Sequence, residues 1–497
     1  MKKYFVGIDQ GTTGVTVILF DRKWNQVSRG YCEEQLFYPR NGWVEHDPED
    51  VWKSVCKALD EALKKINADK QEIISIGIDH EGESVVIWDK DTGKAVYPVI
   101  VWQDRRMAHY CDSIRSQYEP MIKEKTYLQL DSYFSATKLK WILDYADKDR
   151  TLAKSGKLLA GTMDVWLVWK MTAGKCHKTD SSTASRTMLY NIHEKDWDND
   201  LLTLFQIPRI LMPEICSSHQ QFCVTDPNAF LGLKVPVTGI LVDQQAALLG
   251  QACVYPGRVK TTYGTGCFML MNTGSKIISS QNGLLSTVAW RDYEDDVYAL
   301  DGGIYIAGAA IEWLRNKLQL IASAKETSAI AESIDNTNGL YFVPAFTGLA
   351  APYWDSYARG MMIGITGNTS KADIVRATLE AIAYQVKDVL TVMEKDSDTN
   401  ITVMRCDGGV SNNDFLMQFQ ADILGIPVEV PIVKDTTALG AAFMAAVGIG
   451  EYEQLNCISD TWKLAKRYEP TISEDQQAYL MRQWHRALER SRSWNQV

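Results

Sequence analysis

The alternation of apolar and polar residues switches repeatedly between a strand period and a helix period along this chain. Residues 3–8 form a short apolar run, residues 9–13 are turn-forming, and residues 15–20 are rich in β-branched side chains. Such runs favour strands, so the N-terminus is predicted to be a strand, a tight turn and a second strand. Residues 73–79 and 83–88 are predicted to be further strands.

Two segments have the pattern of amphipathic helices. The first begins after Asp47, whose carboxylate can accept hydrogen bonds from the first turn as the N-cap. Apolar residues then recur every three or four positions. The second runs from about residue 370 to residue 394, and Ser370 with Asp373 can form a capping box at its start.

The second half of the chain repeats the plan of the first. Residues 235–242 are predicted to be a strand, and residues 258–262 and 267–271 flank a turn rich in Gly and Thr. Alternating strands and helices indicate an α/β fold, and 497 residues exceed the size at which one core keeps growing. We therefore expect two similar lobes that face a central cleft, residues 1–250 and 251–497.

Composition narrows the classes of function. The formal net charge of -10 and the pI near 5.4 argue against binding nucleic acid or anionic membranes, which requires clustered positive charge. The apolar run after Lys3 is too short for a secretion signal, and no apolar stretch reaches membrane-spanning length. The 10 cysteines are scattered without a C-x-x-C pair, which favours reduced thiols. A cytoplasmic enzyme is expected, without nucleic-acid or membrane partners.

Three glycine-rich turns are candidates for binding phosphate or nucleoside. Residues 9–13 lie between two predicted strands, where glycine lets backbone N–H groups approach an anion and threonine adds hydroxyl donors. The carboxylate of Asp9 can hold a hydrated Mg²⁺ that bridges phosphate oxygens. Residues 262–266 form a similar turn, and residues 407–413 follow a strand and precede a helix. None matches the Walker P-loop, and the first turn alone is equally typical of an ordinary hairpin.

Asp243 is the candidate general base because it follows an apolar strand. A carboxylate at a strand end can accept the proton of a hydroxyl that attacks the γ-phosphorus of ATP. The competing interpretation is that Asp243 only caps the helix that follows, and its spacing alone favours the cap.

Motifs along nearly the whole chain resemble the FGGY family of carbohydrate kinases. In the family's order they are G-I-D-Q-G-T-T from Gly7, G-W-V-E-H-D-P from Gly42, V-W-Q-D-R-R from Val101, Y-F-S-A-T-K-L-K-W-I-L-D from Tyr133, D-Q-Q-A-A-L-L-G from Asp243, T-Y-G-T-G-C-F-M-L-M-N-T-G from Thr262, V-P-A-F-T-G-L-A-A-P-Y-W-D from Val343, Y-A-R-G from Tyr357 and D-G-G-V-S-N-N-D-F-L-M-Q-F-Q-A-D-I-L-G from Asp407. The resemblance implies a two-lobed, actin-like (ribonuclease H-like) ATPase fold with an internal duplication. It also implies transfer of the γ-phosphate of MgATP to a terminal hydroxyl of a small polyol, with glycerol favoured, and a dimer or tetramer.

Carried over residue by residue, the resemblance assigns roles at three places. Asp243 would be the catalytic base, Asp9 would lie by the metal ion, and Thr12 and Thr13 would contact phosphate. The acceptor pocket would consist of Gly82, Glu83, Trp102, Tyr133, Asp243, Gln244 and Phe268. The nucleotide site would consist of Thr265, Gly308, Glu312, Gly409 and Asn413.

The chain departs from the family pattern near the chemistry. The family's Gln-Arg-Glu is Glu81-Gly82-Glu83 here, so an arginine that donates to polyol hydroxyls is missing. Thr16 also stands where the family has an arginine, and Glu312 replaces a glutamine near the expected ribose site. Losing a charged donor would weaken glycerol binding roughly tenfold or more. The space expected at Gly82 would suit a longer polyol.

Three functions therefore stay open at this point. They are phosphorylation of glycerol, phosphorylation of a longer polyol or a ketose by a sister kinase, and ATP sensing without turnover. The retained carboxylates Asp9 and Asp243 and both phosphate turns count against the sensor, because a protein that only binds has no use for a catalytic base.

Overall fold

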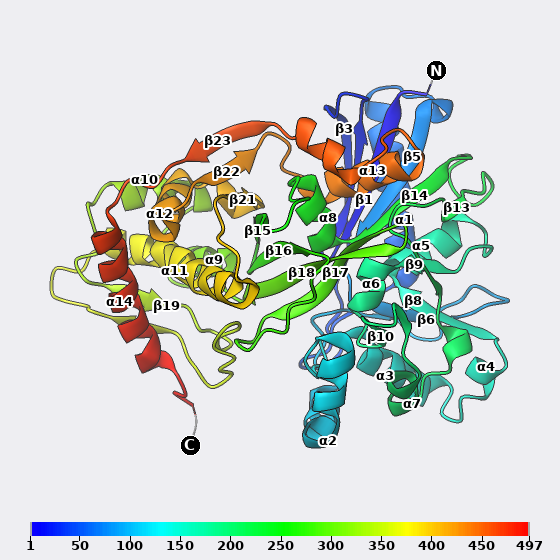
Figure 1. Cartoon of the computed structure of the whole chain (residues 1–497), viewed down its shortest axis with the longest axis horizontal. Helices are drawn as coiled ribbons and strands as arrows, with labels where there is room; N and C mark the ends of the chain where they lie inside the picture. The colour runs from blue at the N-terminus through cyan, green and yellow to red at the C-terminus, as the bar shows by residue number, and fades with distance from the viewer. Residues whose placement is uncertain (1, 496–497) are drawn as a thin grey trace.

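The computed structural model describes residues 2–495, and its N-terminal lobe is built on a mixed six-stranded sheet in the order β13-β14-β5-β1-β2-β3 (Figure 1). The strands are β1 (Tyr4–Gly11), β2 (Gly14–Phe20), β3 (Gln26–Glu33), β5 (Ile73–His80), β13 (Cys223–Val224) and β14 (Pro236–Val242). β1, β2 and β3 are antiparallel neighbours, whereas β1, β5 and β14 run parallel. The strand, turn and strand predicted at the N-terminus are confirmed.

The C-terminal lobe repeats this plan in a seven-stranded sheet in the order β17-β18-β16-β15-β21-β22-β23. The strands are β15 (Val259–Tyr263), β16 (Cys267–Gly274), β17 (Leu285–Asp292), β18 (Asp295–Ile304), β21 (Met404–Asp407), β22 (Val428–Pro431) and β23 (Leu464–Tyr468). β15, β16 and β18 are antiparallel, whereas β15, β21 and β22 run parallel. The predicted duplication is therefore present in the topology.

Both helices predicted in detail are present. α1 (Pro48–Lys65) begins after Asp47, whose side chain accepts hydrogen bonds from the first turn. α11 (Lys371–Ser397) begins with the capping box of Ser370 and Asp373, and its apolar face packs in the core of the C-terminal lobe. Within residues 2–495, no helix combines the length and the apolar character needed to cross a bilayer.

The remaining elements complete the two lobes. In the N-terminal half they include the sheet β4-β7-β6-β8, formed by β4 (Glu45–His46), β6 (Val85–Asp89), β7 (Val99–Ile100) and β8 (Leu158–Thr162), together with β9 (Lys178–Asp180), β12 (Glu214–Cys216), α2 (Ala108–Thr126), α3 (Ser135–Ala146), α5 (Met163–Met171), α6 (Ser181–Ser185) and α7 (Asn199–Leu204). In the C-terminal half they include α9 (Gly308–Asn316), α10 (Thr327–Glu332), β19 (Tyr341–Val343), β20 (Met361–Ile363), α12 (Asp414–Leu424) and α14 (Glu474–Ser491).

Two helices rich in small residues connect the lobes. α13 (Thr436–Gly448) lies between β22 and β23 of the C-terminal sheet in sequence but packs on β1, β5 and β14 of the N-terminal sheet (Figure 1). α8 (Asp243–Gly250) follows β14 and contacts β15 and β16 of the other lobe. The two helices cross at glycines, because a Cβ on Gly440 would lie 1.9 Å from the carbonyl oxygen of Ala246.

A row of three glycines lets α13 lie directly on the N-terminal sheet. Gly7, Gly77 and Gly239 are neighbours across β1, β5 and β14. A Cβ added at any of them would lie 1.9–2.4 Å from a backbone atom of α13. Contacts this short are impossible, so these positions must be glycine for the helix to dock.

We expect Gly77→Ala to prevent α13 from docking and to lower the free energy of unfolding by more than about 3 kcal/mol, because the added methyl group would overlap backbone that cannot rotate away. Denaturant unfolding of the purified variant measures this. Gly367→Ala is the control, because nothing lies within 4 Å of its added Cβ. Equal unfolding midpoints for the two variants would contradict the packing argument.

Candidate active site

Three aspartates meet at the carboxyl ends of the parallel strands of the N-terminal sheet. Asp9 on β1 pairs in register with Asp79 on β5. Asp79 in turn pairs with Leu241 on β14, two residues before Asp243. The carboxyl ends of parallel strands are where α/β sheets bind ligands, so the predicted base and the predicted metal ligand share one site.

Burial and mutual repulsion raise the pKa values of this aspartate group. The pKa of Asp9 rises to about 6, chiefly through burial, although a hydrogen bond from the Thr437 hydroxyl to Asp9 Oδ2 (2.7 Å) opposes the rise. The pKa of Asp79 lies well above its usual range, through burial and then the charges of Asp9 and Asp243. Neither carboxylate oxygen of Asp79 has a hydrogen-bond partner within residues 2–495. This surplus of unpaired carboxylate oxygens suits a hard cation.

Asp243 is the first residue of α8 and not its cap, since the N-cap position falls on Val242. Within residues 2–495 its carboxylate accepts hydrogen bonds only from Gln244, at 2.6 Å from the backbone nitrogen and 3.2 Å from Nε2. Lys260 Nζ holds the amide of Gln244 in turn, at 2.5 Å from Oε1. Burial raises the pKa of Asp243, while Gln244 and the charge of Lys260 oppose the rise. The side chain is thus held in place by its neighbour.

The structure brings most of the predicted acceptor residues together. Trp102 Nε1 donates to Thr12 Oγ1 (2.8 Å), which joins the pocket to the phosphate turn. The ring of Tyr133 lies edge-on to Trp102 with centroids 5.7 Å apart. Lys260, which holds Gln244, also contacts the carbonyl oxygen of Phe268 (3.5 Å). Aromatic rings beside polar groups are side chains suited to binding a polyol.

The expectation of open space at Gly82 is wrong. A Cβ at this position would lie 2.7 Å from Val242 Cγ1 and 3.6 Å from Arg186 Cγ. The space is already filled by these two side chains, which come from distant parts of the sequence. The missing side chain at Gly82 is therefore not replaced by open space at this position.

Thr16, which stands where the family has an arginine, has a cationic neighbour from another strand. Arg29 on β3 donates from Nη2 to the Thr16 hydroxyl (3.2 Å) and lies 3.7 Å from Asp435. Since Thr16 pairs with Asp9 across β1 and β2, a guanidinium group is still present behind the phosphate turn. The sequence pattern alone did not reveal this replacement.

The second and third glycine turns lie against each other in the C-terminal lobe. Gly308, the first residue of α9, donates from its N–H to the carbonyl oxygen of Gly264 (3.0 Å). A Cβ on Gly308 would also lie 3.2 Å from Val410 in the third turn. Two neighbouring N–H groups, of Ala307 and Ala309, donate to the carbonyl oxygen of Thr265. The predicted nucleotide residues from three segments thus converge.

Three other residues predicted to bind the nucleotide differ in whether other protein groups already contact them. A Cβ on Gly409 would meet nothing within 4 Å, so this backbone is open to a ligand. Asn413 is the N-cap of α12, and its Nδ2 donates to Thr327 (2.8 Å). Glu312 pairs with Arg315 (2.5 Å) and accepts from Asn316 within α9. The side chains of Asn413 and Glu312 are therefore engaged within their own lobe.

Sequence reasoning missed a group of buried acids behind the phosphate turn. Both oxygens of Glu34 and of Glu81 lack hydrogen-bond partners within residues 2–495, and His46 Nε2 lies 3.9 Å from Glu34. Burial, followed by the charge of Glu81, raises the pKa of Glu34 to about 8, and burial raises that of Glu81 to about 7. Asp79 was also missed, although the tripeptide Gly-Ile-Asp occurs on both β1 and β5.

The carboxylates fit a magnesium ion that nucleotide phosphates help to hold. Among residues 2–495, no group of three or more His, Cys, Asp or Glu side chains is arranged to hold a metal ion by itself. Mg²⁺ usually keeps several waters and binds through one or two carboxylates together with phosphate oxygens. Asp9, with the unpartnered Asp79 beside it, meets this requirement.

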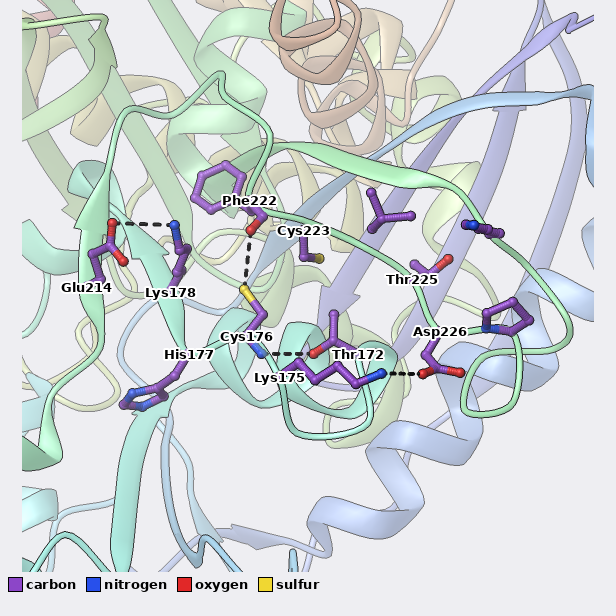
Figure 2. A pocket seen from close by; sticks show the side chains of 13 residues that line it. Thr172, Lys175, Cys176, His177, Lys178, Glu214, Phe222, Cys223, Thr225 and Asp226 are labelled. Atoms are coloured by element: carbon purple, nitrogen blue, oxygen red, sulfur yellow. Dashed lines mark hydrogen bonds and ion pairs between the residues drawn. The ribbon is translucent and has the colours of Figure 1, made fainter.

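A surface cavity of about 560 Å³ lies elsewhere in the N-terminal half (Figure 2). Its wall includes Cys176, Lys178, Cys223 and Asp226, and none of the predicted site residues lines it. This cavity is therefore separate from the predicted site.

Comparison with known proteins agrees with this geometry. The model of the N-terminal domain of the FGGY family of carbohydrate kinases matches residues 4–250, and that of the C-terminal domain matches residues 259–449. The chain belongs to the FGGY family of carbohydrate kinases. This kinase is 48% identical over 493 residues to glycerol kinase 2 of Thermotoga maritima and 49% identical over 494 residues to glycerol kinase of Carboxydothermus hydrogenoformans, with 99% of each chain covered.

Solved structures of the family have the same fold. Plasmodium falciparum glycerol kinase with ADP superimposes with a TM-score of 0.92 at 34% identity, covering 98% of both chains. Xylulose kinase from Lactobacillus acidophilus gives a TM-score of 0.87 at 21% identity, covering 98% of this chain and 97% of that one. The two-lobed, actin-like fold expected for this FGGY kinase is confirmed.

We expect the stability of the enzyme to fall as the pH rises from about 5 to about 8.5, and Glu34→Gln to reduce this fall by about 1–3 kcal/mol. The native state keeps a proton on Glu34 that the unfolded chain releases near its ordinary pKa, so each step up in pH favours unfolding. Thermal unfolding against pH measures the effect. Glu124→Gln, at an exposed position, is the control. Equal pH slopes in wild type and Glu34→Gln would contradict the prediction.

Proposed function

We propose that this FGGY kinase transfers the γ-phosphate of MgATP to a terminal hydroxyl of glycerol, giving glycerol 3-phosphate. The proposal rests on one observation above all, the carboxylate of Asp243 at the end of β14 beside the register pair of Asp9 and Asp79. The choice of glycerol is supported by the full-length similarity to proteins named glycerol kinase.

Asp243 would accept the proton of the attacking hydroxyl. Burial raises the pKa of Asp243, while Gln244 and the charge of Lys260 favour the ionised form, which is the form that acts as a base. Glu83 and Gln244 would hydrogen-bond the remaining hydroxyls, while Trp102 and Tyr133 cover the C–H faces. The proton would thus leave as the O–P bond forms, without a covalent enzyme intermediate.

The phosphate groups would be held from both lobes. Thr12 and Thr13 offer hydroxyl and backbone donors from the first turn, and Thr265 and Gly409 lie in the turns of the other lobe. Asp9 would hold Mg²⁺, which neutralises charge on the phosphate oxygens during transfer. Enclosing the acceptor between the lobes would exclude water that otherwise hydrolyses ATP.

The hypothesis of a longer acceptor rested on open space at Gly82. Val242 and Arg186 occupy that space, so this support is gone. A sensor without turnover would leave Asp243, the proposed base, without a role. The cytoplasmic location and the homo-oligomer stay predictions.

We expect Asp243→Asn to lower kcat by about 10²- to 10⁴-fold, because the amide cannot accept the proton, while the Kd for ATP changes by less than about threefold. Coupled assays of ADP release and calorimetry with ATP measure the two quantities. Asp50→Asn, at an exposed position on α1, is the matched control.

The same assay with glycerol, dihydroxyacetone, erythritol, threitol, the pentitols and the ketopentoses tests the acceptor. The highest kcat/KM is expected for glycerol. A higher value for a longer polyol or a ketose would refute glycerol as the substrate, and full turnover by Asp243→Asn would refute the base.

A further inference from the structure

Arg186 is a buried cation that connects the two lobes at the acceptor pocket. It directly follows α6 and is only 4% exposed. Its Nε donates to Glu83 Oε1 at 2.7 Å, and its Nη1 donates to Asp301 Oδ2 at 3.0 Å. Asp301 belongs to β18 of the C-terminal sheet. One guanidinium group therefore joins a predicted acceptor ligand in one lobe to a strand of the other.

The surroundings of Arg186 place it at the pocket wall. The guanidinium carbon lies 5.9 Å from the ring centroid of Tyr133 and 5.6 Å from that of Phe134. Its stem is one of the two groups that a side chain at Gly82 would meet. The third nitrogen, Nη2, makes no hydrogen bond to any of residues 2–495, so it still has donors to offer to a ligand oxygen or water.

Electrostatics show what Arg186 does for Glu83. Burial raises the pKa of Glu83, and the charge and hydrogen bond of Arg186 are the largest opposing influences. A buried carboxylate is a good acceptor for hydroxyl groups only while it is ionised and held in one orientation. Without Arg186, Glu83 would be protonated over a wider pH range and free to rotate.

We propose that Arg186 is a positioning residue for the phosphoryl acceptor, which orients Glu83 toward the acceptor's hydroxyl groups and, through Asp301, couples acceptor binding to the arrangement of the two lobes. The proposal rests on the function proposed above but does not depend on which polyol or sugar is the acceptor. Arg186 does not take part in phosphoryl transfer itself.

The decisive variant is Arg186→Gln. We expect its KM for the acceptor to rise at least about tenfold, while its KM for ATP changes less than about twofold. The acceptor KM of the variant should also rise more steeply than that of the wild type as the pH falls, because removing Arg186 raises the pKa of Glu83 further. Arg186→Lys should recover part of the loss, since it keeps the charge but not the two-armed geometry.

A double-mutant cycle tests the link to the opposite lobe. Asp301→Asn should raise the acceptor KM by a smaller factor, and its effect should nearly vanish when Arg186 is already glutamine. If Arg186→Gln does not fold, Arg186→Lys and Asp301→Asn carry the same test. Arg376→Gln, which removes a partly buried Arg–Glu pair (2.8 Å) inside α11, is the control for general destabilisation and should leave the acceptor KM unchanged.

Specific results would overturn the proposal. The positioning role is refuted if Arg186→Gln leaves the acceptor KM unchanged or raises the KM for ATP equally. The link between the lobes is refuted if the effects of Arg186→Gln and Asp301→Asn are strictly additive. If the wild type prefers an acceptor other than glycerol, the proposed substrate fails, and the measurement is made with that acceptor. The two failures are therefore distinguishable.

Discussion

The direct contact between α13 and the N-terminal sheet is the constraint on which the candidate site depends. Three glycines in one row remove the side chains that would separate helix and sheet. The helix therefore brings Thr437, from the C-terminal half, within 2.7 Å of Asp9 on β1. Residues more than four hundred positions apart complete one site because backbone meets backbone.

The carboxyl ends of β1, β5 and β14 bring several carboxyl groups together without matching cations from the described residues. Asp79 is buried and lies beside the half-buried Asp9 and Asp243, and Glu34 and Glu81 are buried behind the phosphate turn. Burial, followed by the charges of neighbouring carboxylates, raises the pKa values of these groups. A cation with bound phosphates would supply a counter-charge, so an arrangement that costs stability is suited to binding MgATP.

Sequence reasoning succeeded where the signal was local. The caps at Asp47 and Ser370, the hairpin of β1 and β2, and the glycine turns each depend on neighbouring residues. The prediction of open space at Gly82 was wrong, because Val242 and Arg186 from other segments occupy that space. Sequence reasoning missed Asp79 for the same reason, since only strand pairing brings the second Gly-Ile-Asp beside the first.

The sequence by itself determined the family, the α/β class and the duplicated strand plan, because motifs and periodicity are properties of adjacent positions. Only the tertiary structure decided which side chains share a site. It set Arg186 between Glu83 and Asp301, filled the position beside Gly82, and left the carboxylate of Asp79 unpaired. These facts depend on register and helix packing, which join distant segments and leave no mark on any single stretch of sequence.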